Sequence, residues 1–261
     1  MMEQSRLSKK ERHELILSEV RRSASIRVSR LALRLGVAGE TIRRDLIELG
    51  DAGLLNRTYG GATISLMTSE PVIAERSQTM IEERARIGRG AAGLVEKGQI
   101  VMIDGGSTTY EVARSLSQLK RELTIITNSI GVASVTGANP TFRVILCPGT
   151  YDSREASVVG EDTVEFVKRY NADIAIIGAS SLSADGPSDM ISGAAAVKRA
   201  MIARALSTAL VVTNDKFGRN SLERVCGLGE LSDIVTDREP QPALRAVIEA
   251  AGTELHVFNA G

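Results

Sequence analysis

Short apolar runs rich in β-branched residues alternate with helical stretches over the C-terminal part of the chain. The runs cover residues 99–103, 123–126, 142–146, 174–177, 209–212 and 234–235, and helical spacing is clearest in 110–119, 159–170, 194–206 and 242–250. Strands that are apolar throughout are typical of parallel sheets with helices on both faces, because both sides of each strand are then buried. The sequence therefore predicts a mostly parallel α/β domain over residues 77–261.

The N-terminal part shows helical spacing without such runs. Residues 8–22 fit a helix that opens with a Ser-x-x-Glu capping box. Ser29 is expected to cap a second, short helix over 30–35, and Gly36 to end it in the left-handed conformation that glycine tolerates. The second helix, joined by a tight turn to a third, indicates a helix-turn-helix.

The third helix combines an apolar stripe with exposed cations. Its stripe has three- and four-residue spacing and consists of Ile42, Leu46 and Leu49. Arg43 and Arg44 are therefore expected on or beside the opposite face, where a DNA groove could receive them. Residues 54–64, with a Gly-Gly turn, fit a small β-hairpin that would form a wing beside this helix.

Charge is unevenly divided along a chain that is neutral overall. Residues 1–61 carry 12 Lys and Arg against 8 Asp and Glu, and the rest of the chain carries 20 against 24. A surplus of positive charge on the part with the helix-turn-helix favours a nucleic-acid partner for that part. Aromatic residues make up only 3% of the chain and Trp is absent, which favours duplex DNA over base-stacking recognition of single strands.

The remaining composition narrows the class of protein further. The chain has no apolar run near the roughly 18–20 residues of a membrane span and no signal-peptide pattern, so we expect a cytoplasmic protein without membrane contact. Cys147 and Cys226 lie far apart in apolar segments and are expected to be reduced core residues. Residues 63–76 lack periodicity and are predicted to link a domain over 1–62 to the domain over 77–261.

Small polar residues follow four of the predicted strands. Asp-Gly-Gly-Ser-Thr-Thr occupies 104–109, Thr-Asn-Ser 127–129, Pro-Gly-Thr 148–150 and Gly-Ala-Ser-Ser 178–181. Ligands of parallel sheets bind at the carboxyl ends of the strands, where glycines permit close approach and helix N-terminal amides hold phosphate oxygens. These loops predict a pocket for a phosphorylated sugar, in which Asp104 would accept from sugar hydroxyls. The alternative is that each loop only makes a turn and a helix cap.

Lys198 and Lys216 are candidates to neutralise a phosphate, although either could be an ordinary solvated lysine. His13 and His256 stand without a partner motif and are interpreted as structural. The sequence shows no Ser/His/Asp set, metal-ligand spacing or Walker loop, so no catalytic residue, metal or cofactor is predicted.

Taken together, the motifs resemble the DeoR (deoxyribose-repressor) family of bacterial transcriptional regulators. The resemblance rests on Thr-Ile-Arg-Arg-Asp-Leu at 41–46, the Gly-Leu-Leu and Arg-Thr-Tyr-Gly-Gly-Ala segments of the wing, Asp-Gly-Gly-Ser-Thr-Thr, Thr-Asn-Ser, Val-Lys-Arg-Ala-Met and Lys-Phe-Gly, in this order. It implies a winged helix-turn-helix followed by an α/β effector domain that resembles ribose-5-phosphate isomerase and CoA-transferase-type folds. It also implies repression of a carbohydrate-utilisation operon and release of DNA when a phosphorylated sugar binds.

The resemblance also assigns residues to two sites. The residues expected to face DNA are Ser29, Arg30, Thr41, Arg43, Arg44, Arg57 and Tyr59. Those expected to line the effector pocket are Asp104, Gly105, Gly106, Ser107, Thr108, Thr109, Asn128, Gly149, Lys198 and Lys216.

Several positions depart from the family's usual residues. Ala38 stands where a serine usually caps the recognition helix, and Gly39 could serve as the cap instead. In the effector domain, Pro148 replaces the first glycine of a Gly-Gly pair, Pro187-Ser188 replaces Leu-Thr, Ala194 replaces glutamate and Thr213 replaces aspartate. Because most of them fall in the effector domain, the sequence predicts unusual effector chemistry.

Three functions stay open at this point. The favoured one is a DNA-binding repressor controlled by a sugar phosphate and acting as a homo-oligomer, a dimer or tetramer, on repeated half-sites. The others are a phosphosugar isomerase with a helical appendage, and a DNA-binding protein whose second domain only oligomerises. The missing carboxylates at positions 194 and 213 weaken the isomerase, since enolisation needs a positioned base.

Overall fold

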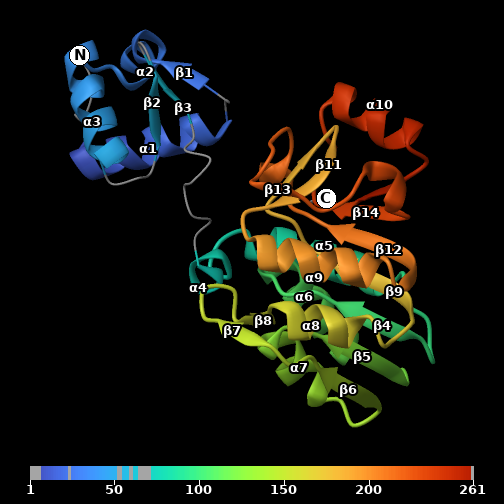
Figure 1. Cartoon of the computed structure of the whole chain (residues 1–261). Helices are drawn as coiled ribbons and strands as arrows, with labels where there is room; N and C mark the ends of the chain where they lie inside the picture. Colours follow the sequence, from blue (N-terminus) through green and yellow to red (C-terminus); the bar gives the residue numbers. More distant parts are fainter. Residues whose placement is uncertain (1–6, 23–24, 52–54, 59–60, 64–71, 260–261) are drawn as a thin grey trace. The chain divides into compact units, whose positions relative to one another are not determined.

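In the computed structural model of the chain, the described residues are 7–22, 25–51, 55–58, 61–63 and 72–259. The chain divides into two compact units, residues 1–69 and 70–261, and each is described by itself (Figure 1). Among the described residues, no helix combines the length and the apolar character that a membrane span requires.

The first unit is a three-helix assembly with a small antiparallel sheet. In chain order its elements are α1 (Lys9–Arg22), β1 (Ser25–Arg27), α2 (Val28–Leu35), α3 (Gly39–Asp51), β2 (Asn56–Thr58) and β3 (Gly61–Thr63). The strands are ordered β1-β3-β2, with Asn56 opposite Thr63 across the hairpin. The helix-turn-helix α2-α3 and the β2-β3 hairpin thus occur where the sequence predicts them.

The apolar spacing of the three helices explains their packing. The buried core of the unit consists of Ile16, Ile26, Leu31, Ile42, Leu46, Leu49 and Leu55. α1 opens with the expected capping box, in which Ser8 N–H donates to Glu11 and Glu11 N–H donates to the Ser8 hydroxyl. Gly36 ends α2 with φ of 64°, a left-handed conformation that favours glycine.

Two predicted helix caps are wrong. α2 begins at Val28 with Arg27 at its N-cap position and no side-chain cap, so Ser29 is already inside the helix. The reason is that β1 runs directly into α2, which leaves no free residue for a serine cap. Gly39 is likewise the first residue of α3 and not its cap, because the Thr41 amide already donates to the Ala38 carbonyl.

A buried carboxylate joins α1 to α3. Asp45 is 2% exposed, and its oxygens accept from Arg12 Nε at 2.5 Å and Nη2 at 2.9 Å, while His13 Nε2 lies 3.1 Å away. Burial by itself would raise the pKa of Asp45, but hydrogen bonds and attraction from Arg12 and His13 hold that pKa below its ordinary value. The carboxylate therefore stays charged and fixes α3 against α1.

The second unit is built around a parallel sheet. Its helices are α4 (Ile73–Arg76), α5 (Ile81–Ala92), α6 (Ser107–Ser117), α7 (Ile130–Gly137), α8 (Glu161–Val167), α9 (Ser192–Ile202), α10 (Pro242–Ala250) and the 3-10 turns Asn214–Lys216 and Leu228–Glu230. The large sheet contains β4 (Ile100–Ile103), β5 (Leu123–Thr127), β6 (Phe142–Leu146), β9 (Ala172–Ile177), β12 (Ala205–Val211), β14 (Asp233–Thr236) and β15 (Glu254–Val257).

The seven strands are ordered β15-β14-β12-β9-β4-β5-β6, and every neighbouring pair is parallel. Alternate residues of β4 show why helices cover both faces: Val101 and Ile103 pack with the helices α5, α6 and α7, whereas Met102 packs with α8 and α9. All six predicted strands belong to this sheet, so the predicted parallel α/β architecture is confirmed.

The sequence analysis missed the seventh strand and the short accessory strands. The accessory strands are β7 (Thr150–Asp152), β8 (Ser157–Val159), β10 (Ser181–Ser183), β11 (Gly186–Asp189) and β13 (Glu223–Arg224). They are two to four residues long and, apart from Ser-Val-Val in β8, mostly polar, and β15 alternates polar with apolar residues, so none forms a long apolar run. Both cysteines are free and buried, as expected.

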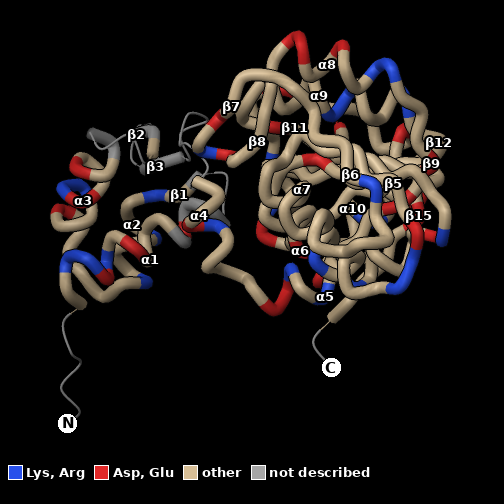
Figure 2. Tube along the Cα trace, turned by 90° about the horizontal axis from the view of Figure 1, so that it is seen from below, with Lys and Arg blue, Asp and Glu red and all other residues tan. Residues whose placement is uncertain are grey.

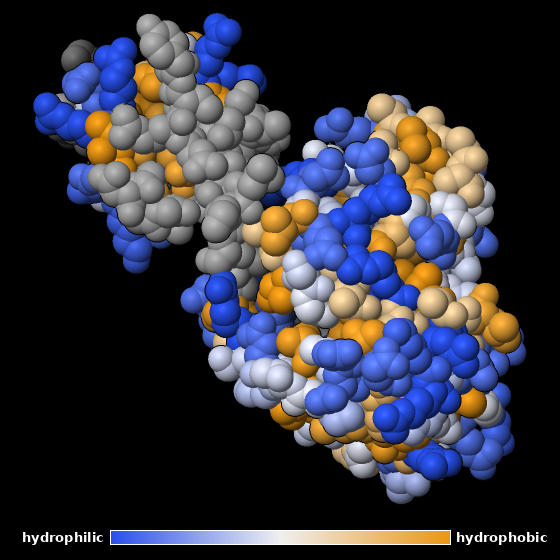
Figure 3. All heavy atoms as spheres, viewed as in Figure 1, coloured by the Kyte–Doolittle hydropathy of each residue, from blue (hydrophilic) through white to orange (hydrophobic). Residues whose placement is uncertain are grey.

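Two surface features complete the second unit. α4 lies within the stretch 63–76 that the sequence predicts as a linker, of which 64–71 fall outside the described residues, and its Ile73 amide donates to the Arg154 carbonyl of the second unit at 2.8 Å. α10 buries Ile248 in the core, and hydrophobic residues also gather on its outer side, where Val247 is 39% exposed (Figure 3).

We expect Asp45→Asn to lower the free energy of unfolding of the first unit by about 2 kcal/mol at pH 7, because charged hydrogen bonds to Arg12 are lost. The pKa of Asp45 is lower when folded, so this contribution is present above the ordinary carboxyl pKa and disappears as the pH falls through the lowered value. The difference from wild type should therefore shrink on acidification.

Urea unfolding at pH 7 and at acidic pH, read by pulsed hydrogen exchange in α1 and α3, measures both effects. Glu48→Gln is the matched control, since its ion pair with Lys9 is half exposed and contributes little. An Asp45→Asn variant as stable as this control at pH 7 would refute the structural role of Asp45.

Candidate functional site

The order in which strands are added to the sheet reverses between β4 and β9: β5 and β6 are added on one side of β4, and β9, β12, β14 and β15 on the other. β4 pairs with β5 on one side and with β9 on the other, so the loops that leave β4 and β9 diverge to opposite faces. In open α/β sheets the crevice at such a reversal, outside the carboxyl ends of the strands, is where ligands bind. Asp104 lies at this point, directly after β4, and its amide donates to the Ile176 carbonyl of β9 at 3.0 Å.

A cavity opens at this reversal. Of the residues predicted for the effector pocket, those that line it are Asp104, Gly105, Gly106, Ser107, Thr108, Thr109, Lys198 and Lys216. Three further lining residues, Gly178, Ala179 and Ser180, belong to the predicted loop 178–181, and Ala194 is one of the departures from the family pattern. The sequence analysis did not assign the remaining lining residues to the pocket; they are Arg76, Glu155, Ser157, Asp189 and Val211. Six separate segments of chain therefore contribute to one cavity: residue 76 and residues 104–109, 155–157, 178–180, 189–198 and 211–216.

Asn128 and Gly149 do not line the cavity. Asn128 is 1% exposed and bridges two loops, because its Oδ1 accepts the Gly105 N–H at 3.2 Å and its Nδ2 donates to the Val158 carbonyl at 3.0 Å. Gly149 has φ of 147°, and a Cβ there would lie 2.1 Å from the Thr163 hydroxyl. Both residues shape the loops around the cavity and do not face it.

Lys198 of α9 forms a buried ion triad at the base of the cavity. Its Nζ lies 2.8 Å from Asp104 Oδ2 and 2.9 Å from Asp189 Oδ2, and the three side chains are between 1% and 8% exposed. Burial disfavours all three charges; for Lys198 the two carboxylates overcome this and raise its pKa, and for Asp189 the ammonium lowers the pKa. For Asp104 burial prevails and the pKa is raised.

The triad changes what Lys198 can do. Its positive charge is already matched by two carboxylates, so it is not the free cation for phosphate that the sequence suggested. Instead it fixes the oxygens of Asp104 and Asp189, which are well suited to accept hydrogen bonds from hydroxyl groups. Asp189 escaped the sequence analysis because it ends β11, a short polar strand with no apolar run to mark it.

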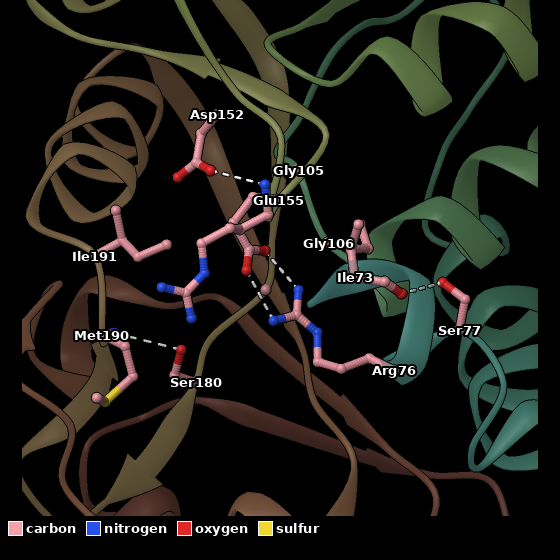
Figure 4. A network of polar contacts seen from close by, with 12 residues as sticks. Ile73, Arg76, Ser77, Gly105, Gly106, Asp152, Glu155, Ser180, Met190 and Ile191 are labelled. Carbon is pink, nitrogen blue, oxygen red and sulfur yellow. Dashed lines mark hydrogen bonds and ion pairs between the residues drawn. The ribbon is translucent and has the colours of Figure 1, made fainter. Parts of the chain in front are cut away.

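Arg76 and Glu155 meet at another side of the cavity (Figure 4). Arg76 Nη1 donates to Glu155 Oε1 at 2.9 Å, and Nη2 donates to Oε2 at 2.5 Å. Arg76 ends α4 and Glu155 lies in the turn between β7 and β8, so no spacing rule in the sequence connects them. Lys216, the remaining cation of the cavity, donates to the Ala179 carbonyl at 2.7 Å.

The cavity also receives the N-terminus of α6. Gly106 is its N-cap residue and offers no side-chain oxygen to the first-turn amides, and Ser107 and Thr108 of that turn line the cavity. The first amides of a helix have no partner within it and attract anions. The site thus combines hydroxyl-accepting carboxylates at its base with anion-binding groups beside them.

The predicted DNA-contacting residues are distributed over α2, α3 and the hairpin. Ser29, Arg30, Arg43 and Arg44 are exposed, and Thr41 is half-buried. On α3 basic residues are interspersed with acidic ones (Figure 2), and Arg43 Nη1 lies 3.1 Å from Glu40 Oε2. Arg57 belongs to β2, and Tyr59 lies outside the described residues.

A further cluster of polar side chains lies on the neighbouring strands β14 and β15, outside the cavity. Among the described residues, Asp233, Glu254 and His256 hold their potential metal-binding atoms within 4.8 Å of one another. His256 Nε2 lies 2.7 Å from Asp233 Oδ1, so the histidine has a structural partner across β14 and β15.

We expect Lys198→Met to lower the stability of the second unit by about 3–5 kcal/mol, because it leaves two buried carboxylates facing each other. This corresponds to a drop of about 10 °C in Tm. Thermal unfolding of the full chain tests it, with Lys168→Met as control, since Lys168 pairs with Glu165 on the surface. Equal Tm values for the two variants would show that the triad does not stabilise the fold.

Comparison with known proteins agrees with this description of two units. Residues 12–67 match the DeoR-like helix-turn-helix domain, and residues 79–238 match the DeoR C terminal sensor domain. The glycerol-3-phosphate regulon repressor of Escherichia coli (strain K12) is 31% identical over 239 residues, 91% of this chain and 94% of that protein. The HTH-type transcriptional repressor GlcR of Bacillus subtilis (strain 168) is 29% identical over 248 residues, 95% of both chains.

Among solved structures, ribose-5-phosphate isomerase A of Methanocaldococcus jannaschii has a TM-score of 0.39 and 15% identity, over 51% of this chain and 53% of that one. The two relatives named above match along nearly the whole chain and are transcriptional repressors, not enzymes, which argues against the isomerase alternative. This chain belongs to the DeoR family of transcriptional regulators, with a helix-turn-helix domain followed by a sensor domain.

Proposed function

We propose that this protein represses a carbohydrate-utilisation operon and that a phosphorylated sugar, bound in the cavity between β4 and β9, controls its affinity for DNA. The observation that carries the proposal is the composition of this cavity. Buried carboxylates of Asp104 and Asp189 are fixed for hydroxyl groups, and the N-terminus of α6 supplies amides for an anion. Hydroxyls and an anionic group together describe a sugar phosphate.

The DNA side of the proposal rests on α3. The apolar stripe of α3 is buried in the core, and Arg43 and Arg44 are exposed. The ion pair of Asp45 with Arg12 holds the helix in place. Arginines on such a helix can bind phosphate or pair with guanine in the major groove. Because one reading helix and one wing contact only a short site, we propose that the protein binds repeated half-sites as a homo-oligomer, a dimer or tetramer.

The identity of the sugar is constrained by the departures from the family pattern. Ala194 lines the cavity where a glutamate is common in the family, so an acceptor for one hydroxyl is replaced by a methyl group. We therefore propose a ligand that differs from the usual effectors of the family at one hydroxyl-bearing position. Glycerol 3-phosphate belongs in any test panel, because it appears in the name of a relative.

The first test concerns the reading helix. A duplex selected from a random library by the wild-type protein serves as operator. We expect Arg43→Ala and Arg44→Ala each to weaken binding by about 10- to 100-fold and to reduce its salt dependence where a phosphate contact is lost. Lys97→Ala, at an exposed lysine of the sensor unit, is the control. Wild-type affinity for the Arg43→Ala variant would disprove its assigned role.

The second test concerns the ligand. Fluorescence anisotropy of the selected duplex is measured with phosphorylated sugars and, as matched controls, with the same sugars lacking phosphate. We expect at least one phosphorylated sugar to change the DNA affinity by about tenfold or more and its unphosphorylated counterpart to have no effect. If no phosphorylated sugar changes the affinity, the proposed control by a sugar phosphate is wrong, as expected of a second unit that only oligomerises.

A further inference from the structure

The ion pair of Arg76 and Glu155 lies where a ligand's anionic group would be recognised. Both side chains line the cavity that also receives the N-terminus of α6, and Figure 4 shows the Arg76 guanidinium facing Glu155 with Gly105 and Gly106 nearby. Arg76 is only 7% exposed, so its charge is held at the cavity and not in solvent. A buried arginine of this kind needs an anionic partner.

We propose that Arg76 binds the phosphate of the effector and that Glu155 is its intramolecular competitor, so that effector binding exchanges the glutamate for phosphate. This inference rests on the proposed function and adds to it the phosphate-binding residue and the structural event that follows binding. Neither residue belongs to the set predicted from the sequence.

The geometry of the pair supports the exchange. Two guanidinium nitrogens of Arg76 donate in parallel to the two oxygens of Glu155, at 2.9 Å and 2.5 Å. Two oxygens of a phosphate present the same acceptor pair, and arginine binds both carboxylate and phosphate in this forked manner. Glu155 therefore occupies the position in which a phosphate group would satisfy the same donors.

The charge of the cavity explains why a carboxylate has to leave. Three cationic residues, Arg76, Lys198 and Lys216, line it together with three acids, Asp104, Glu155 and Asp189, so their formal charges cancel. A phosphate monoester brings a charge of roughly −1.5 to −2. Without the departure of an acid, the side chains that line the cavity would offer this charge no net positive charge.

Glu155 is the acid best placed to leave. Asp104 and Asp189 are tied to Lys198 and their side chains are 1% and 8% exposed. Glu155 lies in the turn 153–156, and its side chain is 15% exposed, so it is nearer to solvent than either of these two acids. The next residue, Ala156, has φ of 48°, a left-handed conformation that alanine seldom adopts, so the turn is held away from its relaxed geometry.

The same turn anchors the first helix of the sensor unit. Ile73 N–H donates to the Arg154 carbonyl at 2.8 Å, and Arg84 of α5 donates to the carbonyls of Arg76 and Thr79. In the sequence, α4 follows directly on residues 64–71, which lead from the helix-turn-helix unit. Exchange at Arg76 therefore alters the attachment of the segment through which the sensor unit is joined to the DNA-binding unit.

The test is a calorimetric titration of the full-length protein with inorganic phosphate. We expect Glu155→Gln, which removes the competing charge and keeps the shape, to bind phosphate about tenfold or more tightly than wild type. Arg76→Gln should lose phosphate binding, and Arg76→Lys, which keeps the charge without the fork, should weaken it by about tenfold. Glu239→Gln, which breaks the surface pair with Arg245, is the matched control and should leave the affinity unchanged.

Two outcomes overturn the proposal: equal phosphate affinity for wild type and Glu155→Gln, or no phosphate binding by either of these two proteins. Both outcomes are read from wild type and Glu155→Gln, so the result does not depend on the folding of Arg76→Gln, whose Tm is measured alongside. The operator assay separates the two hypotheses. If sugar phosphates change operator binding while Glu155→Gln leaves phosphate affinity unaltered, the exchange is wrong and the proposed function stands. If phosphate binds more tightly to Glu155→Gln but no sugar phosphate affects operator binding, the anion site stands and the proposed function fails.

Discussion

The buried ion triad of Lys198, Asp104 and Asp189 is the constraint on which the sensor unit depends. It ties together the end of β4, the end of β11 and the middle of α9, three elements that meet only in the folded state. Charges in the interior are tolerated only when each has a partner at hydrogen-bond distance, so each member fixes the position of the other two. The base of the cavity is rigid for this reason.

The triad also determines the chemistry left to the rest of the cavity. Because Lys198 is paired with two carboxylates, the base of the cavity presents carboxylate oxygens and has no unpaired positive charge. In the proposed function, the anionic group of the ligand is recognised from the side, where the N-terminus of α6 and the guanidinium of Arg76 lie. A ligand that carries both hydroxyl groups and an anionic group would then bind in one orientation.

Local sequence patterns predicted much of the architecture. Continuous apolar runs such as 142–146 identified strands of the parallel sheet, since burial on both faces leaves no polar position. The stripe of Ile42, Leu46 and Leu49 identified the helix α3. The cap at Ser29 was wrong because a short strand enters α2 directly, and a cap depends on where the preceding chain comes from.

The sequence by itself determined the order of the domains, the parallel sheet and the polar loop 104–109 at its carboxyl edge, because these follow from periodicity and from residues adjacent in the chain. Only the tertiary structure decided that Asp189 shares Lys198 with Asp104 and that Glu155 occupies the fork of Arg76. Arg76 and Glu155 are 79 positions apart. Electrostatic pairing depends on distance in space, and no local pattern carries that information.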